Sequence, residues 1–157
     1  MRLSLQTWTD NAILRAISTP VKTNELHKYR VLAEAMLAYV RNPKNGGIGL
    51  AAPQVGVNKR IIVVGLAKDR EDESYPLVIM VNPVLTKKST ETSIDEEWCL
   101  SLPGIKWDVE RPHTIEVEWL DIRGKKMRKT VTGLGAKVVQ HEIDHIDGIL
   151  ISDKFLK

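Results

Sequence analysis

The sequence has no long apolar segment and only one cysteine among its 157 residues. No run approaches the roughly 20 apolar residues that a membrane-spanning helix needs, and one cysteine excludes an internal disulfide. The first residues lack the apolar core of a secretory signal and the Arg/Ser-rich pattern of a transit peptide. We therefore expect a soluble, cytoplasmic protein in which Cys99 serves some purpose other than a disulfide.

The sequence also has little excess charge of either sign. Lys and Arg total 23 against 20 Asp and Glu, a net charge of +3, which is too small to indicate nucleic-acid binding without a concentrated patch. The one dense basic run, residues 125–129, is interpreted as a solvated strand edge beside a turn. Length and composition predict a single domain over residues 1–157. We expect a monomer with neither nucleic acid nor membrane as a partner.

Hydrophobic periodicity predicts two helices and several strands. A long N-terminal helix is expected over residues 24–41, capped by Thr23 or Asn24. Strands are expected at 60–64, 77–81, 114–120 and 127–132, the last two as a hairpin, and a final helix at 134–146. Asn82-Pro83 is expected to end the second strand. The pattern predicts an α+β fold with mainly antiparallel sheets packed around the C-terminal helix.

The final predicted helix carries His141, Glu142 and His145 in an H-E-x-x-H pattern. Residues four apart lie on one face of a helix, so both imidazoles can reach the same metal ion. Glu142 flanks that face and can hold a metal-bound water without being a ligand. The alternative is an ordinary helix with two exposed histidines.

Two imidazoles leave a divalent ion short of a protein ligand. Downstream of His145 the chain offers the carboxylates of Asp147 and Asp153. Cys99 is the better candidate, because a thiolate is a strong ligand for Zn²⁺ or Fe²⁺. A lone cysteine in isolation is more often a small buried hydrophobe, so the neighbours of Cys99 in the sequence decide between these readings.

Three separated stretches resemble the motifs of the peptide deformylase family. They are Gly47-Ile48-Gly49-Leu50-Ala51-Ala52-Pro53-Gln54 for G-x-G-L-A-A-x-Q, Glu97-Trp98-Cys99-Leu100-Ser101 for E-G-C-L-S, and Gln140-His141-Glu142-Ile143-Asp144-His145 for Q-H-E-x-x-H. Residues 10–21 also resemble the opening segment of the family. Because the order and separation of the three motifs agree, the resemblance covers nearly the whole chain.

The resemblance implies a hydrolase that removes the N-formyl group from the formyl-methionine of nascent polypeptides and releases formate. It implies one divalent metal ion, usually Fe²⁺ with Zn²⁺, Ni²⁺ or Co²⁺ as substitutes, held by Cys99, His141 and His145. A water takes the fourth position, with Glu142 as the general base and acid. The Gln54 side-chain amide and the Leu100 backbone N–H are the implied donors to the oxyanion.

The resemblance also implies how the peptide is held. The segment with Ile48 and Gly49 pairs with the substrate as an added strand, although a Gly-x-Gly turn alone is usually a plain connector. Leu134 and Val138 share the helix face of His141, where they line either a pocket for the methionine side chain or only the core.

Two charged motif residues have an implied supporting role. Arg111 matches a family arginine that pairs with Glu97 and would fix the loop that carries the cysteine. A solvated surface arginine is the alternative reading of the same residue.

The chain departs from the family in two places. Trp98 stands where the motif has glycine, and since glycine permits close approach of a substrate backbone, we expect Trp98 to form an aromatic wall that alters peptide preference. The chain also ends nine residues past Gly148, short of the long helix that docks many bacterial members on the ribosome, so the resemblance alone does not establish the ribosome as a partner.

Two rival functions use the same residues. The first is an H-E-x-x-H metallopeptidase of another kind, which the lack of a third histidine after His145 disfavours. The second is a non-catalytic module that binds metal or formyl peptides, which the intact Glu142 and Gln54 disfavour.

Overall fold

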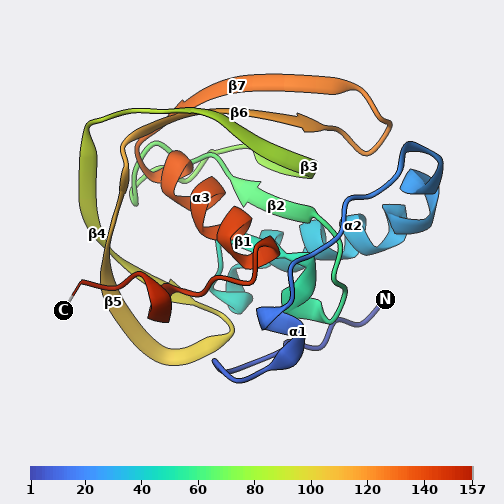
Figure 1. Cartoon of the computed structure of the whole chain (residues 1–157), viewed down its shortest axis with the longest axis horizontal. Helices are drawn as coiled ribbons and strands as arrows, with labels where there is room; N and C mark the ends of the chain where they lie inside the picture. Colours follow the sequence, from blue (N-terminus) through green and yellow to red (C-terminus); the bar gives the residue numbers. More distant parts are fainter. Residues whose placement is uncertain (157) are drawn as a thin grey trace.

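The computed structural model describes residues 1–156 and has the expected α+β architecture (Figure 1). The helices are α1 (Ala12–Arg15), α2 (Leu26–Arg41) and α3 (Leu134–Ile146). The strands are β1 (Gly49–Ala51), β2 (Ile61–Gly65), β3 (Leu77–Lys88), β4 (Thr92–Cys99), β5 (Leu102–Pro112), β6 (Thr114–Leu120) and β7 (Lys126–Thr132). None of the described helices combines the length and the apolar character that crossing a bilayer requires.

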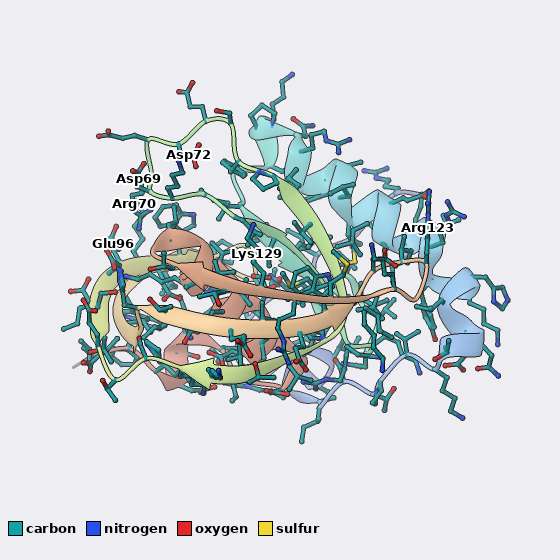
Figure 2. All side chains as sticks on the ribbon, turned by 90° about the horizontal axis from the view of Figure 1, so that it is seen from above. Asp69, Arg70, Asp72, Glu96, Arg123 and Lys129 are labelled. Carbon is teal, nitrogen blue, oxygen red and sulfur yellow. The ribbon has the colours of Figure 1, made fainter. Side chains whose placement is uncertain are left out.

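The named strands form two antiparallel sheets. The larger sheet has the order β1-β2-β3-β6-β7, and β4 pairs only with β5. The predicted hairpin is present as β6 and β7, paired from Thr114 with Thr132 to Leu120 with Lys126. β7 lies at the edge of the sheet, and Lys129 on it is exposed (Figure 2). The basic run therefore lies on a strand edge, as its sequence context indicated.

The core lies on both faces of the larger sheet, as the interior strand β2 shows. Side chains alternate between the faces of a strand: Ile62 and Val64 pack in the cluster that contains Val139 and Ile146 of α3. The intervening residues of β2 pack instead in a second cluster with α2. Every residue of β2 is buried, which explains why this strand is a continuous apolar run. The helix with the H-E-x-x-H pattern is thus seated against a sheet.

Two expectations about local structure are corrected. Asn82-Pro83 does not end β3, which continues to Lys88 across a register shift between Val81 and Val84. Proline cannot donate to a sheet ladder and is tolerated at such a bulge, while the Asn82 side chain bonds the backbone of Val21 in both directions.

The predicted cap of the first long helix is also wrong. Neither Thr23 nor Asn24 caps it, since both lie in a 3₁₀ turn and α2 begins at Leu26. The sequence did not predict strands β4 and β5. Most residues of β4 are exposed, and its apolar residues do not alternate.

The C-terminal end of α3 rests directly on the N-terminal segment. The Ser18 N–H and the Arg60 guanidinium both donate to the Ile146 carbonyl, at 2.8 and 3.1 Å. Gly148 follows with φ +74°, and a Cβ there would lie 2.4 Å from the Arg15 carbonyl oxygen. The absence of a side chain at Gly148 is therefore what lets the two segments meet.

Replacing Gly148 with alanine tests this contact, with Gly104→Ala as the matched control. Gly104 also has a positive φ, +77°, but a Cβ there meets nothing within 4 Å. We expect Gly104→Ala to lower the free energy of unfolding by about 1 kcal/mol, the cost of the left-handed conformation. Gly148→Ala should lose about 1–3 kcal/mol more, because the backbone must shift. Urea denaturation measures both losses, and equal values would contradict the contact.

Candidate metal centre

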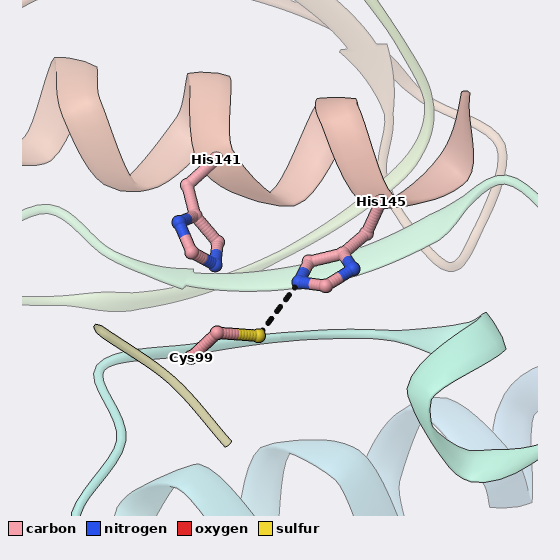
Figure 3. Close-up of side chains that lie close together, drawn as sticks. All are labelled: Cys99, His141 and His145. Atoms are coloured by element: carbon pink, nitrogen blue, oxygen red, sulfur yellow. Dashed lines mark hydrogen bonds between the residues drawn. The ribbon is translucent and has the colours of Figure 1, made fainter. Parts of the chain in front are cut away.

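Three potential metal ligands from two distant segments meet in the structure. α3 directs His141 and His145 toward Cys99, the last residue of β4 (Figure 3). The Cys99 Sγ lies 3.2 Å from the His145 Nε2, and one donor atom from each of the three residues lies within 4.8 Å of the others. Cys99 and His145 are buried. One thiolate and two imidazoles are a donor set that suits Zn²⁺ or Fe²⁺.

The two aspartates considered as alternative ligands lie in other interactions. Asp147 pairs with Arg60 at 2.9 Å, and Asp153 pairs with Arg15 at 2.6 Å. Of the ligands weighed from the sequence, the structure brings only the cysteine to the two histidines.

Hydrogen bonding orients the His141 ring. Its Nδ1 lies 2.9 Å from the Glu97 Oε1, so the Nδ1–H donates to this carboxylate and the Nε2 lone pair faces the other ligands. Burial lowers the pKa of His145 well below its usual value. The His145 ring is therefore in the neutral form that binds a cation. Burial lowers the pKa of His141 as well, but its interactions with Cys99 and Glu97 outweigh burial and raise this pKa, so the His141 ring would release a proton when a cation binds.

Glu97 is itself held by the buried Arg111. The guanidinium donates to both carboxylate oxygens, at 2.6 and 2.9 Å, and a third nitrogen lies 2.8 Å from Asp144 on α3. Burial alone would raise the pKa of Glu97, but hydrogen bonds from His141 and Arg111 lower it to about 2. Only 3% of the Arg111 side chain is exposed. The prediction of a solvated surface arginine is therefore wrong, and the prediction that Arg111 pairs with Glu97 is confirmed.

Glu142 lies next to the three ligands and is buried. Its Oε1 is 3.6 Å from the His141 Nε2, and its Oε2 has no hydrogen-bond partner within the described chain. Burial raises the pKa of this carboxyl to about 7. A buried carboxylate oxygen without a partner, beside a ligand cluster, fits a place for a water or a substrate group.

Gln54 reaches the same centre from the turn after β1. Its Oε1 accepts from the Ala51 N–H at 2.9 Å, which turns the amide nitrogen toward Cys99. That nitrogen lies 3.1 Å from the Ser101 Oγ and 3.7 Å from the Cys99 Sγ. Gln54 is thus a buried, bonded amide whose donor faces the candidate site.

A pocket opens beside the centre. Its lining includes predicted residues from four segments: Ile48, Gly49, Gln54, Glu97, Trp98, Cys99, Leu100, Leu134, Val138, His141 and Glu142. Val138 both lines the pocket and packs in the core. A Cβ on Gly49 would lie 3.0 Å from atoms of both Glu142 and Val138, and glycine therefore lets β1 approach α3.

Sequence reasoning missed four residues that line the pocket: Arg70, Asp95, Glu96 and Lys137. Lys137 precedes His141 by one helical turn, and this spacing could have indicated it. In the structure it is nearly buried and forms an ion pair with Asp95. No pattern in the sequence connects Arg70 with the site.

Comparison with known proteins gives one consistent result. A family model described as polypeptide deformylase matches residues 4–157. The peptide deformylase of Rhizobium meliloti is 44% identical over 145 residues, which cover 92% of this chain and 80% of that protein. The peptide deformylase of Synechocystis sp. is also 44% identical, over 80% of this chain but only 65% of that longer protein.

Solved structures agree with the sequence relatives. A Met-Ala-Ser-bound class I type b peptide deformylase from Acinetobacter baumannii has a TM-score of 0.89 and 35% identity, covering 99% of both chains. A probable peptide deformylase from Synechococcus phage S-SSM7 has a TM-score of 0.79 and 41% identity, covering 98% of this chain and 100% of that one.

The buried arginine gives a prediction about stability. Arg111→Gln leaves the Glu97 carboxylate without its cation and leaves Asp144 with only the exposed Lys154, so we expect the free energy of unfolding to fall by about 3–5 kcal/mol. The control is Arg30→Gln, which removes an exposed pair with Glu34 on α2 and should cost about 0.3–0.5 kcal/mol. Chemical denaturation of both variants at the same metal content measures the two free energies of unfolding. If both variants lose a similar amount, Arg111 does not hold the two elements together.

Proposed function

The chain belongs to the polypeptide deformylase family, and we propose that it hydrolyses the N-formyl group of the formyl-methionine that begins new polypeptides, releasing formate. The observation that carries the proposal is the meeting of Cys99, His141 and His145 beside a buried, unpartnered oxygen of Glu142. All of these residues come from one chain, which supports a monomer as the active unit. We place its activity in the cytoplasm, where nascent formyl-methionyl peptides emerge.

Cys99, His141 and His145 would hold one divalent ion, for which we propose Fe²⁺, with Zn²⁺, Ni²⁺ or Co²⁺ as substitutes. When bound, the ion supplies Lewis acidity to the attacking water and the formyl oxygen. The thiolate leaves the centre with less positive charge than three histidines would, so a positioned base matters more.

Glu142 is the proposed base and acid. Its carboxylate takes a proton from the water as the oxygen attacks the formyl carbon, and it later gives that proton to the leaving amine nitrogen. A pKa of about 7, raised by burial, suits a group that must both accept and donate a proton near neutral pH. The buried position of Glu142 also excludes bulk water from this transfer.

Gln54 and Leu100 are the proposed oxyanion donors. Attack on the formyl carbon places negative charge on its oxygen, and donors that are already oriented stabilise it without reorganisation. The Ala51 N–H fixes the Gln54 amide in such an orientation. The Leu100 backbone follows the proposed ligand Cys99 directly and lines the pocket.

The peptide is proposed to bind beside β1. This strand is at the edge of its sheet, so the peptide can add to it as a further strand at Ile48 and Gly49. Leu134 and Val138 supply apolar wall for an unbranched methionine side chain.

The proposal predicts that Glu142→Gln separates metal binding from catalysis. We expect this variant to keep its metal and to release formate from formyl-Met peptides about 10²–10⁴ times more slowly, because the base is lost. Cys99→Ala should instead lose the metal together with the activity. The measurements are metal analysis of anaerobically prepared protein and a formate assay supplied with Fe²⁺.

The same assays separate the rival functions. Robust formate release by the Glu142→Gln variant would refute the proposed base. Cleavage of internal peptide bonds by the wild type would favour a metallopeptidase. Binding of formyl peptides with no turnover would favour a non-catalytic module.

A further inference from the structure

An arginine from a distant loop reaches the outer wall of the pocket. Arg70 lies between β2 and β3, close to Glu96 of β4 (Figure 2). One of its guanidinium nitrogens donates to the Glu96 carbonyl at 2.7 Å. The guanidinium carbon lies 4.7 Å from the centre of the Trp98 ring, so the indole and a backbone carbonyl hold this cation in place.

A second cation lies over the same indole. Lys106 faces Trp98 across the β4–β5 pair, and its Nζ is 5.6 Å from the ring centre. Among residues 1–156, neither Arg70 nor Lys106 forms an ion pair, whereas the nearby Lys137 is neutralised by Asp95. Glu96 contributes its carbonyl to Arg70, and its side chain is exposed. Three more exposed carboxylates without an ion pair in the described chain lie close by: Asp69 and Glu71 flank Arg70 in the sequence, and Asp108 faces Glu96 across the β4–β5 pair.

Arg70 shares one pocket with the proposed catalytic groups, whereas Lys106, over the Trp98 ring, lies outside the lining of that pocket. Arg70 and Trp98 line it together with Gln54, His141 and Glu142. A peptide with its formyl carbon at Glu142 and its backbone along β1 therefore carries its next residues past Trp98. At this place the family motif has glycine, which offers no platform for a cation.

We propose that Arg70, held on Trp98 and assisted by Lys106, is a specificity-determining residue that favours an acidic side chain in the two residues after formyl-methionine; this inference rests on the proposed function. A guanidinium presents a planar fork of donors that matches a carboxylate. Because Trp98 and the Glu96 carbonyl already orient the fork, little side-chain entropy is lost when a carboxylate binds.

The test compares peptides that differ only in one charge. Formyl-Met-Ala-Glu-amide is paired with formyl-Met-Ala-Gln-amide, and formyl-Met-Glu-Ala-amide with formyl-Met-Gln-Ala-amide. We expect kcat/KM to favour glutamate about twofold to fivefold in at least one pair at low salt, the range of a solvent-exposed ion pair. The preference should decline toward one in about 0.5 M salt, because screening weakens exposed charges.

Variants assign the preference to its residues. Arg70→Gln should bring the Glu/Gln ratio close to one, and Trp98→Gly should lower it by removing the platform. The matched control is Arg123→Gln, an exposed arginine far from Arg70 in Figure 2, which should keep the wild-type ratio. A wild-type ratio of one, or an unchanged ratio in Arg70→Gln, overturns the inference.

Failure of the inference is distinguishable from failure of the proposed function. Hydrolysis of the glutamine peptides without discrimination refutes the acidic preference alone. If no peptide releases formate, the proposed function fails, and calorimetry with Met-Ala-Glu-amide and Met-Ala-Gln-amide then tests the cationic wall directly. Tighter binding of the acidic peptide supports it, and equal affinities overturn it.

Discussion

The candidate site depends on one buried cation that joins two separate parts of the fold. Arg111 lies on β5, binds Glu97 on the paired strand β4, and reaches Asp144 on α3. β4 and β5 form a sheet of their own, so this guanidinium links the strand that ends at Cys99 with the helix that carries both histidines. The two carboxylates are themselves mostly buried, with 10% and 14% of their side chains exposed, so losing the cation between them would be unfavourable, and the arginine therefore fixes the spacing of the two elements.

The proposed metal ligands are supported by the buried core, whereas the rim of the pocket is not. The ligands on α3 belong to a helix whose opposite side packs on the larger sheet, while β1 is held close to α3 because Gly49 has no side chain. The pocket rim, in contrast, consists of exposed side chains from a connecting loop and a two-stranded sheet. Catalytic geometry thus rests on the core, and peptide discrimination rests on the surface, where sequence can change at small cost in stability.

The sequence predicted the elements whose apolar residues form a clear pattern, either alternating or continuous, and missed those without one. Residues 114–120 alternate because one face of β6 packs on the core, and the same reasoning fails for β4, which is mostly exposed. The two histidines were recognisable from helical spacing, and Cys99 only from its motif neighbours. Arg70 and Lys106 were not predictable, because their approach to Trp98 depends on a loop path and on a strand register that no local pattern encodes.

The contact between Gly148 and Arg15 bears on when the protein can fold. It joins the two ends of the chain, and the ion pair beside it spans 138 positions. Closing so large a loop costs conformational entropy, and such non-local contacts form slowly. During synthesis, the first residues therefore cannot dock until the last helix has left the ribosome. In the later part of that interval, between the synthesis of Cys99 and that of His141, the thiol is present without its imidazole partners, and the growing chain is open to oxidation or to binding of an ion by the thiol alone.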